Sequence, residues 1–252
     1  MVISVIRTSA FLLFGIPVTV IGTPLVTVCW LVDRSGKIPH SLTRWFLSTL
    51  SYIVGIRVTV EGREHIDRKQ PCLILTNHKS SADILVVARV LHLHFKFFAA
   101  SFLFSIPFFG WCMSMAGYLP IDRSNRVQAR KYIMKGTQKL KSGKASLIIF
   151  PEGTRCEKPV IQDFKYGFLR ISTEAQQPVL PVVVDGTAEV KQKNNFWFRP
   201  GRVHVSILPL QSTSGLTRED WSKTKKKYEK MFRTEYDRIH KIRTSNQNGG
   251  LK

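Results

Sequence analysis

The first 56 residues are far more apolar than the rest of the chain. From Thr8 to Val32 there are 25 residues without a charged side chain, and about 20 apolar residues suffice to cross the hydrocarbon core of a bilayer. A second apolar stretch, over residues 41–56, carries Trp45 and Tyr52, whose residue types favour the membrane–water interface. This pattern predicts an N-terminal membrane-anchoring helical region over residues 1–56.

The hydropathy pattern leaves the path of the first segment through the membrane open. Pro17, Gly22 and Pro24 interrupt the helical pattern, so a kinked span and a re-entrant hairpin both fit it. A signal peptide fits less well, because the apolar run is long and no small-residue cleavage site follows it. Three basic residues between positions 34 and 44 follow the segment and one precedes it, which predicts that the C-terminal bulk lies at the cytoplasmic face.

Beyond residue 57, short apolar runs alternate with longer segments of helical character. The runs that predict strands are 57–61, 72–76, 96–100, 146–150, 179–184 and 203–208. Helices are predicted over 80–91, 124–141, 168–175 and 217–242. This alternation predicts an α/β domain over residues 57–243, with a layered, mostly parallel sheet flanked by helices. The polar residues 244–252 predict a disordered tail.

Composition and charge narrow the class of partners. The 252 residues include 38 Lys and Arg against 17 Asp and Glu, a net charge of +21. Such a surplus favours an anionic partner, such as nucleic acid, an anionic membrane face or an acidic carrier protein. An apolar content of 44% excludes disorder as the dominant state. The four cysteines form no C-x-x-C pair, which indicates reduced thiols and predicts no metal site.

Three polar stretches each directly follow an apolar run. They are residues 77–83 (NHKSSAD), 117–123 (GYLPIDR) and 150–155 (FPEGTR). In open α/β sheets, ligands bind beyond the carboxyl ends of the strands. These turns are therefore well placed to form a site.

The first stretch pairs a histidine with a carboxylate. His78 directly follows a predicted strand, and Asp83 lies in the first turn of the next helix. If the loop folds back, Asp83 fixes one ring nitrogen of His78, and the other can act as a general base toward a hydroxyl. Ser80 and Asp83 also fit a helix capping box, in which Asp83 only satisfies backbone N–H groups. The spacing alone leaves both interpretations open.

The other two stretches contain groups suited to an anion. Gly153 allows a ligand close to the backbone, and Arg155 offers a planar fork that matches phosphate oxygens. Thr154 supplies a hydroxyl, and Glu152 either orients Arg155 or binds a ligand hydroxyl. An exposed turn with a salt bridge is the alternative. Arg123 either binds an anion or belongs to the basic face of the following helix.

Taken together, these motifs resemble the PlsC-type family of glycerolipid acyltransferases, whose best-known members are the 1-acyl-sn-glycerol-3-phosphate acyltransferases. The blocks N-H-x4-D, I-P-F-F-G-W, G-x3-I-D-R, F-P-E-G-T-R and V-L-P-V-V-V follow the order of that family within residues 57–210. The resemblance implies transfer of a fatty acyl group from an acyl carrier protein or coenzyme A thioester to the hydroxyl of a lysophospholipid. It implies no cofactor and no metal.

The resemblance also implies roles for individual residues. His78 would deprotonate the acceptor hydroxyl and Asp83 would orient its ring, while backbone N–H groups near Ser80 would hold the developing oxyanion. The acceptor would be bound by residues 152–155 and by Arg123. Anionic membrane lipids are the expected surroundings of such an enzyme.

One position departs from the family pattern. Many members carry a lysine three residues before the leucine that here is Leu103, but this chain has Ala100 there, and the nearest lysine is Lys96. A lysophospholipid with a larger head group, or a lyso-aminolipid such as an ornithine lipid precursor, is therefore an alternative acceptor. Lys79, next to His78, is a candidate to compensate for the missing lysine.

Two other classes of protein compete with an enzyme. A non-catalytic basic protein of the membrane surface would share the fold, but it would not need His78, Asp83 and Arg155 together. A nucleic-acid-binding module is suggested by the charge alone, and the sequence contains no helix-turn-helix pattern, aromatic RNA-binding block or zinc spacing.

Overall fold

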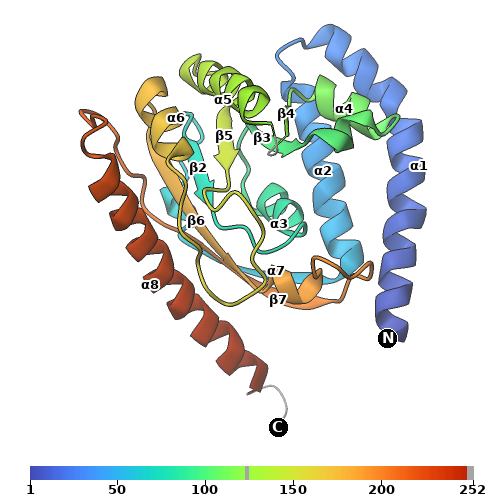
Figure 1. The fold of residues 1–252 in the computed structure, drawn as a ribbon. Coiled ribbons are helices and arrows are strands. Elements are labelled where there is room, and N and C mark those ends of the chain that lie inside the picture. The colour runs from blue at the N-terminus through green and yellow to red at the C-terminus, as the bar shows by residue number, and fades with distance from the viewer. Residues whose placement is uncertain (123–124, 249–252) are drawn as a thin grey trace.

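The computed structural model describes residues 1–122 and 125–248. Its centre is a seven-stranded sheet in the order β1-β7-β6-β2-β5-β3-β4 (Figure 1). The strands are β1 (Ile56–Glu61), β2 (Leu73–Thr76), β3 (Phe95–Ala100), β4 (Leu119–Ile121), β5 (Ser146–Ile149), β6 (Val179–Asp185) and β7 (Gly201–Ile207). Among these strands only the β6–β7 pair is antiparallel. The predicted α/β class with a mostly parallel sheet is confirmed.

Helices cover both faces of the sheet. One face carries α5 (Arg126–Lys141), α6 (Gly167–Ala175) and α8 (Trp221–Asn248). The other carries α2 (Lys37–Val54) and α3 (Asp83–Val90), while α1 (Val2–Val32) packs outside them against α2 and α4 (Phe109–Met115). Shorter turns are η1 (Arg63–His65), η2 (Ser101–Ser105) and α7 (Thr187–Val190).

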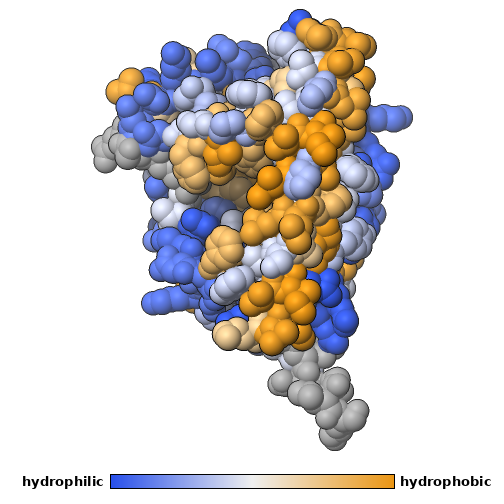
Figure 2. Space-filling view, turned by 90° about the vertical axis from the view of Figure 1, so that its right-hand side faces the viewer, coloured by the Kyte–Doolittle hydropathy of each residue, from blue (hydrophilic) through white to orange (hydrophobic). Residues whose placement is uncertain are grey.

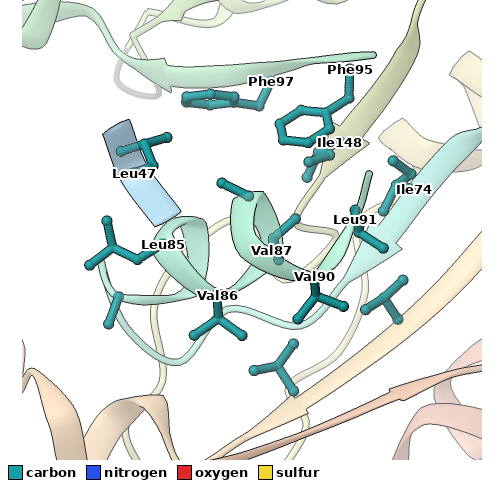
Figure 3. Packing of buried hydrophobic residues seen from close by; sticks show 14 of the residues in the cluster. Leu47, Ile74, Leu85, Val86, Val87, Val90, Leu91, Phe95, Phe97 and Ile148 are labelled. Carbon is teal, nitrogen blue, oxygen red and sulfur yellow. The ribbon is translucent and has the colours of Figure 1, made fainter. Parts of the chain in front are cut away.

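Alternation along the central strands divides the core into two layers. In β2, Ile74 joins the cluster around α3, whereas Leu73 and Leu75 join the cluster under α6 and α8. Successive side chains of a strand point to opposite faces, so a strand buried on both sides reads as a continuous apolar run. Figure 3 shows the first layer, in which Phe95 and Val87 lie between β3 and α3.

Helix α1 is continuous through Pro17 and Pro24, so of the two expected paths the re-entrant hairpin was wrong. Apolar helices tolerate proline where neighbouring helices pack against them. Here α1 packs against α2 and α4, and Thr23 contacts Cys112 of α4. Among the described helices, α1 alone is long and apolar enough to cross a membrane.

Two predicted helix boundaries differ from the structure. Helix α3 begins at Asp83 rather than at residue 80, because residues 77–82 form a loop whose amides are bound by the Asp83 side chain. Helix α8 begins at Trp221 and continues to Asn248, so residues 244–248 are helical where a disordered tail was predicted. The buried Arg243 ties this last part of α8 to the domain through Asp185 and Glu189.

Candidate active site

The carboxyl end of β2 leads directly into the loop that carries His78. Asn77 anchors this loop to β6: its side-chain nitrogen donates to the carbonyl of Val184, and its side-chain oxygen accepts from the Val184 N–H, both at 2.8 Å. The amide thus imitates a step of strand pairing just where β2 ends. These two hydrogen bonds fix the position of His78 relative to the two central strands.

His78 and Asp83 form the predicted pair. Nδ1 of His78 lies 2.7 Å from Oδ2 of Asp83, which is fully buried at the start of α3. The same oxygen accepts the N–H groups of Lys79 and Ser80, and Oδ1 accepts from the Thr187 hydroxyl. Four donors offset the desolvation of the carboxylate. Both interpretations of Asp83 therefore hold, since it satisfies the loop amides and orients the histidine.

The His78 ring is positioned to act as a base. Because a neutral imidazole that donates from Nδ1 to a carboxylate keeps a lone pair on Nε2, that nitrogen can accept a proton. The ring stacks on Phe150, with ring centroids 4.1 Å apart. Its side chain is 14% exposed, at the wall of a cavity that Arg155 also lines.

Glu152 joins the two motif loops. Its Oε1 accepts the His78 N–H at 2.9 Å, and its Oε2 accepts the Gln162 N–H at 3.2 Å. The side chain is buried, and this burial raises the pKa of its carboxyl group. Glu152 was predicted to orient Arg155 or to bind a ligand hydroxyl. The contacts make it a positioning residue for the His78 loop, and its role toward a ligand stays a prediction.

The remaining residues of the second motif form a tight turn beside the cavity. Gly153 has a φ of 73°, a backbone conformation that favours glycine. The exposed Thr154 donates to the Gln162 side chain at 3.3 Å. Arg155 is half-buried and lines the cavity.

The cavity has a volume of about 520 Å³ and two kinds of wall. Its polar part includes His78, Arg155 and Asp122, and its apolar part includes Phe97 and Leu103. Arg123, predicted to bind an anion, lies outside the described residues. The structure thus brings His78, Asp83 and residues 152–155 together at one edge of the sheet, as expected from strand order.

Lys79, the candidate to replace the missing family lysine, and Lys96, the lysine nearest to that position, both point elsewhere. Ala100 lines the cavity. Lys96 is buried, and its Nζ donates to the Ala116 carbonyl at 2.6 Å; burial lowers its pKa to about 8. Lys79 is buried too, and its Nζ donates to the backbone carbonyls of residues 158 and 160. Neither lysine lines the cavity, so Lys79 does not compensate for Ala100.

The backbone amides near Ser80 are engaged within the loop itself. The N–H groups of Lys79 and Ser80 donate to Asp83, that of Ala82 donates to Ser80 Oγ, and that of Asp83 to the Ser80 carbonyl. The N–H of Ser81, a residue that lines the cavity, is not among these engaged amides, so the expectation that an amide near Ser80 holds an oxyanion stays a prediction. Within residues 1–122 and 125–248, no group of three or more His, Cys, Asp or Glu side chains is placed to hold a metal ion.

Thr187 is a site residue that the sequence analysis missed. It lies two residues beyond the end of β6 and donates its hydroxyl proton to Asp83. The rule that ligand sites lie at the carboxyl ends of strands applies to β6 as well as to β2. That rule was the available signal, but it was applied only to the three longer motifs.

Comparison with known proteins places the chain among acyltransferases. The acyltransferase family model matches residues 57–185. The 1-acyl-sn-glycerol-3-phosphate acyltransferase of Saccharomyces cerevisiae is 30% identical over 194 residues, which are 76% of this chain and 64% of the yeast protein. The 1-acyl-sn-glycerol-3-phosphate acyltransferase alpha of Mus musculus is 33% identical over 196 residues, 77% of this chain and 68% of the mouse protein.

A solved structure has the same fold. The crystal structure of the 1-acyl-sn-glycerophosphate (LPA) acyltransferase PlsC from Thermotoga maritima matches with a TM-score of 0.82 and 24% sequence identity, covering 94% of this chain and 96% of that chain. The chain spans about two thirds of the length of the curated relatives it matches. With a family match over the residues that build the site, the chain belongs to the acyltransferase family.

Proposed function

We propose that this protein transfers a fatty acyl group from an acyl thioester to the free hydroxyl of 1-acyl-sn-glycerol-3-phosphate, yielding phosphatidic acid. The proposal rests on the His78–Asp83 pair, in which His78 Nδ1 is hydrogen-bonded to Asp83 at 2.7 Å. His78 lies at the wall of a cavity that Arg155 also lines. The names of the yeast and mouse relatives agree with this acceptor. The chemistry follows from the order in which these groups meet the reacting atoms.

The reaction needs one base and no acyl-enzyme. His78 Nε2 takes the proton of the acceptor hydroxyl while that oxygen attacks the thioester carbonyl carbon. The tetrahedral intermediate then breaks its C–S bond, and the imidazolium returns the proton to the leaving thiolate sulfur. Asp83 stabilises the imidazolium while it exists. Arg155 would hold the acceptor phosphate through its planar fork.

The apolar part of the cavity is suited to an acyl chain. Phe97, Phe102 and Leu103 line it, and the Phe102 side chain is 67% exposed. An acyl chain that lies along these side chains would leave water, at a gain of about 0.8 kcal/mol per methylene. The cavity therefore has an apolar wall for a chain and a cationic wall for a phosphate.

We also propose that α1 and its surroundings dip into the cytoplasmic leaflet of a membrane. The outer side of α1 forms a continuous apolar band (Figure 2), to which exposed Ile3, Leu13, Ile21, Leu31 and further residues contribute. The rest of the domain is attached to α1 through Thr8, which accepts the Phe198 N–H, and through Thr23, which contacts Cys112 of α4. A helix that crossed the bilayer upright would draw this charged domain into hydrocarbon, so an orientation within one leaflet is favoured.

The first experiment compares the purified full chain with His78→Ala. Thioesters of acyl carrier protein and of coenzyme A are offered with 1-acyl-sn-glycerol-3-phosphate. We expect product with one or both donors and a loss of turnover of roughly 10²–10⁴-fold in the variant. An unchanged circular dichroism spectrum is the control for folding. Turnover by His78→Ala close to that of the wild type would refute the mechanism.

Ala100 favours a second candidate acceptor of the same chemistry. It lines the cavity where a family lysine is common, so a lyso-aminolipid or a larger head group would meet less positive charge there. Ala100→Lys distinguishes the two acceptors. If the natural acceptor is 1-acyl-sn-glycerol-3-phosphate, the KM of the variant for it should equal that of the wild type or be lower. A natural lyso-aminolipid should bind the variant less well.

A further inference from the structure

The loop between α7 and β7 carries two large aromatic side chains on the surface. Residues 191–200 (KQKNNFWFRP) include Phe196, which is 61% exposed, and Trp197, which is 38% exposed. The two rings contact each other, with centroids 5.4 Å apart, and we call them the aromatic pair. Neither ring lines the cavity of His78. The proposed reaction therefore leaves this exposed apolar surface unexplained.

The loop is closed and held in one shape by its own hydrogen bonds. The Arg199 N–H donates to the Val190 carbonyl at 2.8 Å, which joins the two ends of the loop. Lys191 Nζ donates to the Asn195 carbonyl, and the Trp197 N–H donates to the Asn195 side chain at 2.9 Å. Compact surface loops with joined ends are frequently functional. Because the loop is already ordered, a contact through the aromatic pair costs little additional ordering.

Phe198 attaches this loop to the N-terminal part of α1. Its N–H donates to the Thr8 hydroxyl at 2.9 Å, and the centroid of its buried ring lies 4.6 Å from that of Phe11. In Figure 1 the loop lies beside the lower half of α1. The aromatic pair directly precedes Phe198, so it lies next to the apolar band to which exposed Ile6 and Leu13 contribute. Figure 2 shows that hydrophobic surface extends sideways from the lower half of this band.

The charges of the loop complement an anionic surface. Residues 191–200 contain Lys191, Lys193 and Arg199 and no acidic residue. Lys193 and Arg199 are exposed, one on each side of the aromatic pair in sequence. Tryptophan is enriched where a membrane meets water, and nearby lysine and arginine are attracted to anionic head groups. Aromatic rings flanked by cations are therefore suited to the head-group level of a membrane.

We propose that the aromatic pair inserts at head-group level into the leaflet that holds α1, a contact that rests on the proposed membrane association. The occupant is lipid rather than a second protein, because the pair continues the apolar band of α1 and basic residues flank it. The loop is also bonded to the site. Ser80 Oγ donates to the Lys191 carbonyl, and the Lys193 N–H donates to Glu157 beside the turn of residues 152–155. Insertion would hold the edge of the sheet that carries His78 against the surface that supplies the acceptor.

The test locates Trp197 with lipids that carry bromine near the start of their acyl chains, because bromine quenches indole fluorescence only at short range. The full chain is placed in vesicles of phosphatidylcholine and phosphatidylglycerol, with and without bromine. Trp197→Phe removes one of five tryptophans, and Trp221→Phe, at the start of α8 across the molecule from α1 (Figure 1), is the matched control. We expect bromine to quench most of the emission that Trp197→Phe removes. The emission that Trp221→Phe removes should stay unquenched.

Vesicle affinity is the second measurement. Phe196→Ser with Trp197→Ser removes the aromatic pair, whereas Val127→Ser with Met134→Ser removes two exposed apolar side chains from α5, on the other face of the sheet. We expect the first double variant to lose affinity by roughly tenfold or more, because two aromatic side chains no longer leave water. The second should lose far less, and equal losses would contradict a dedicated contact.

Three results of the quenching experiment would overturn the proposal. Quenching of the other tryptophans without that of Trp197 would place α1 in lipid and the loop outside it. If the first double variant then also abolished self-association of the chain in detergent, the aromatic pair would belong to a contact between two copies. Equal quenching of Trp197 and Trp221 would mean that the whole domain meets lipid, and no quenching at all would refute the membrane association itself. His78→Ala should lose turnover and keep the quenching, so failure of the reaction mechanism is distinguishable.

Discussion

Replacement of Asp83 by Asn separates the charge of this carboxylate from its hydrogen bonds. The amide has the same shape, and its oxygen can accept the three N–H groups that now reach Oδ2, from His78, Lys79 and Ser80. Its NH₂ group can donate to the Thr187 hydroxyl, which reverses that bond. Because the three N–H groups keep their acceptor, we expect Asp83→Asn to fold and to keep the His78 proton on Nδ1, although the Thr187 hydroxyl proton loses its present acceptor.

The expected loss comes from the imidazolium that forms during the reaction. Two opposite charges about 4 Å apart attract by about 4 kcal/mol at an effective dielectric constant of about 20. That dielectric suits this pair, since the side chains of His78 and Asp83 are 14% and 0% exposed. An attraction lost only in the transition state raises the barrier directly, so about 4 kcal/mol corresponds to a roughly 10³-fold lower kcat.

Steady-state kinetics and thermal unfolding together decide this case. The expected result is a kcat lower by about three powers of ten, a KM for the acceptor close to that of the wild type, and a Tm lower by only a few degrees. A kcat within about tenfold of the wild type, with the fold intact, would refute the view that Asp83 acts through its charge. A collapse of Tm would refute the view that an amide oxygen satisfies the three N–H groups.

Three further substitutions test other parts of the site. Thr187→Val removes one hydrogen bond to a buried carboxylate, so kcat should fall and the free energy of unfolding should drop by roughly 1–3 kcal/mol, as measured by kinetics and urea unfolding. Arg155→Lys keeps the charge but loses the planar fork, so the KM for a phosphate-bearing acceptor should rise about tenfold while kcat changes little. Burial lowers the pKa of Lys96 from 10.5 to about 8, so between these pH values the unfolded chain binds a proton that the folded chain has released, and stability should rise with pH. Lys96→Met should abolish that rise, which urea unfolding measures as the difference in the free energy of unfolding between pH of about 8 and 10.5.

The local parts of this architecture were predictable from the sequence, and the long-range parts were not. Most strands and helices follow from the period of apolar positions, but β4 and α4 were not predicted. The spacing of five residues between His78 and Asp83 permitted their pair without deciding it. The direction of the Lys79 side chain, however, depends on carbonyls about 80 residues away, and Asn77 bonds to a strand 107 residues away. Such contacts depend on which strands become neighbours. A pattern that covers one loop at a time does not contain that information.

Helix α8 contributes to the site through a chain of buried contacts. Arg243 donates to Asp185 and to both carboxylate oxygens of Glu189. These two acidic residues lie just before and just after Thr187 in the sequence. Thr187 in turn donates to Asp83. The turn that binds the Asp83 carboxylate is therefore fixed by a cation near the end of the last helix.

A second contact from α8 reaches the loop next to His78. The Tyr236 hydroxyl donates to Asp185 at 2.8 Å, and the Tyr236 ring lies 4.7 Å from the Lys79 ammonium, which holds two carbonyls of the loop after Arg155. Helix α8 lies beyond residues 57–185, which the family model matches. The family motifs supply the groups proposed to react, but the buried side of the site is built by a helix outside them. The functional unit therefore includes the C-terminal helix, whose sequence pattern alone indicates only a charged helix with one apolar stripe.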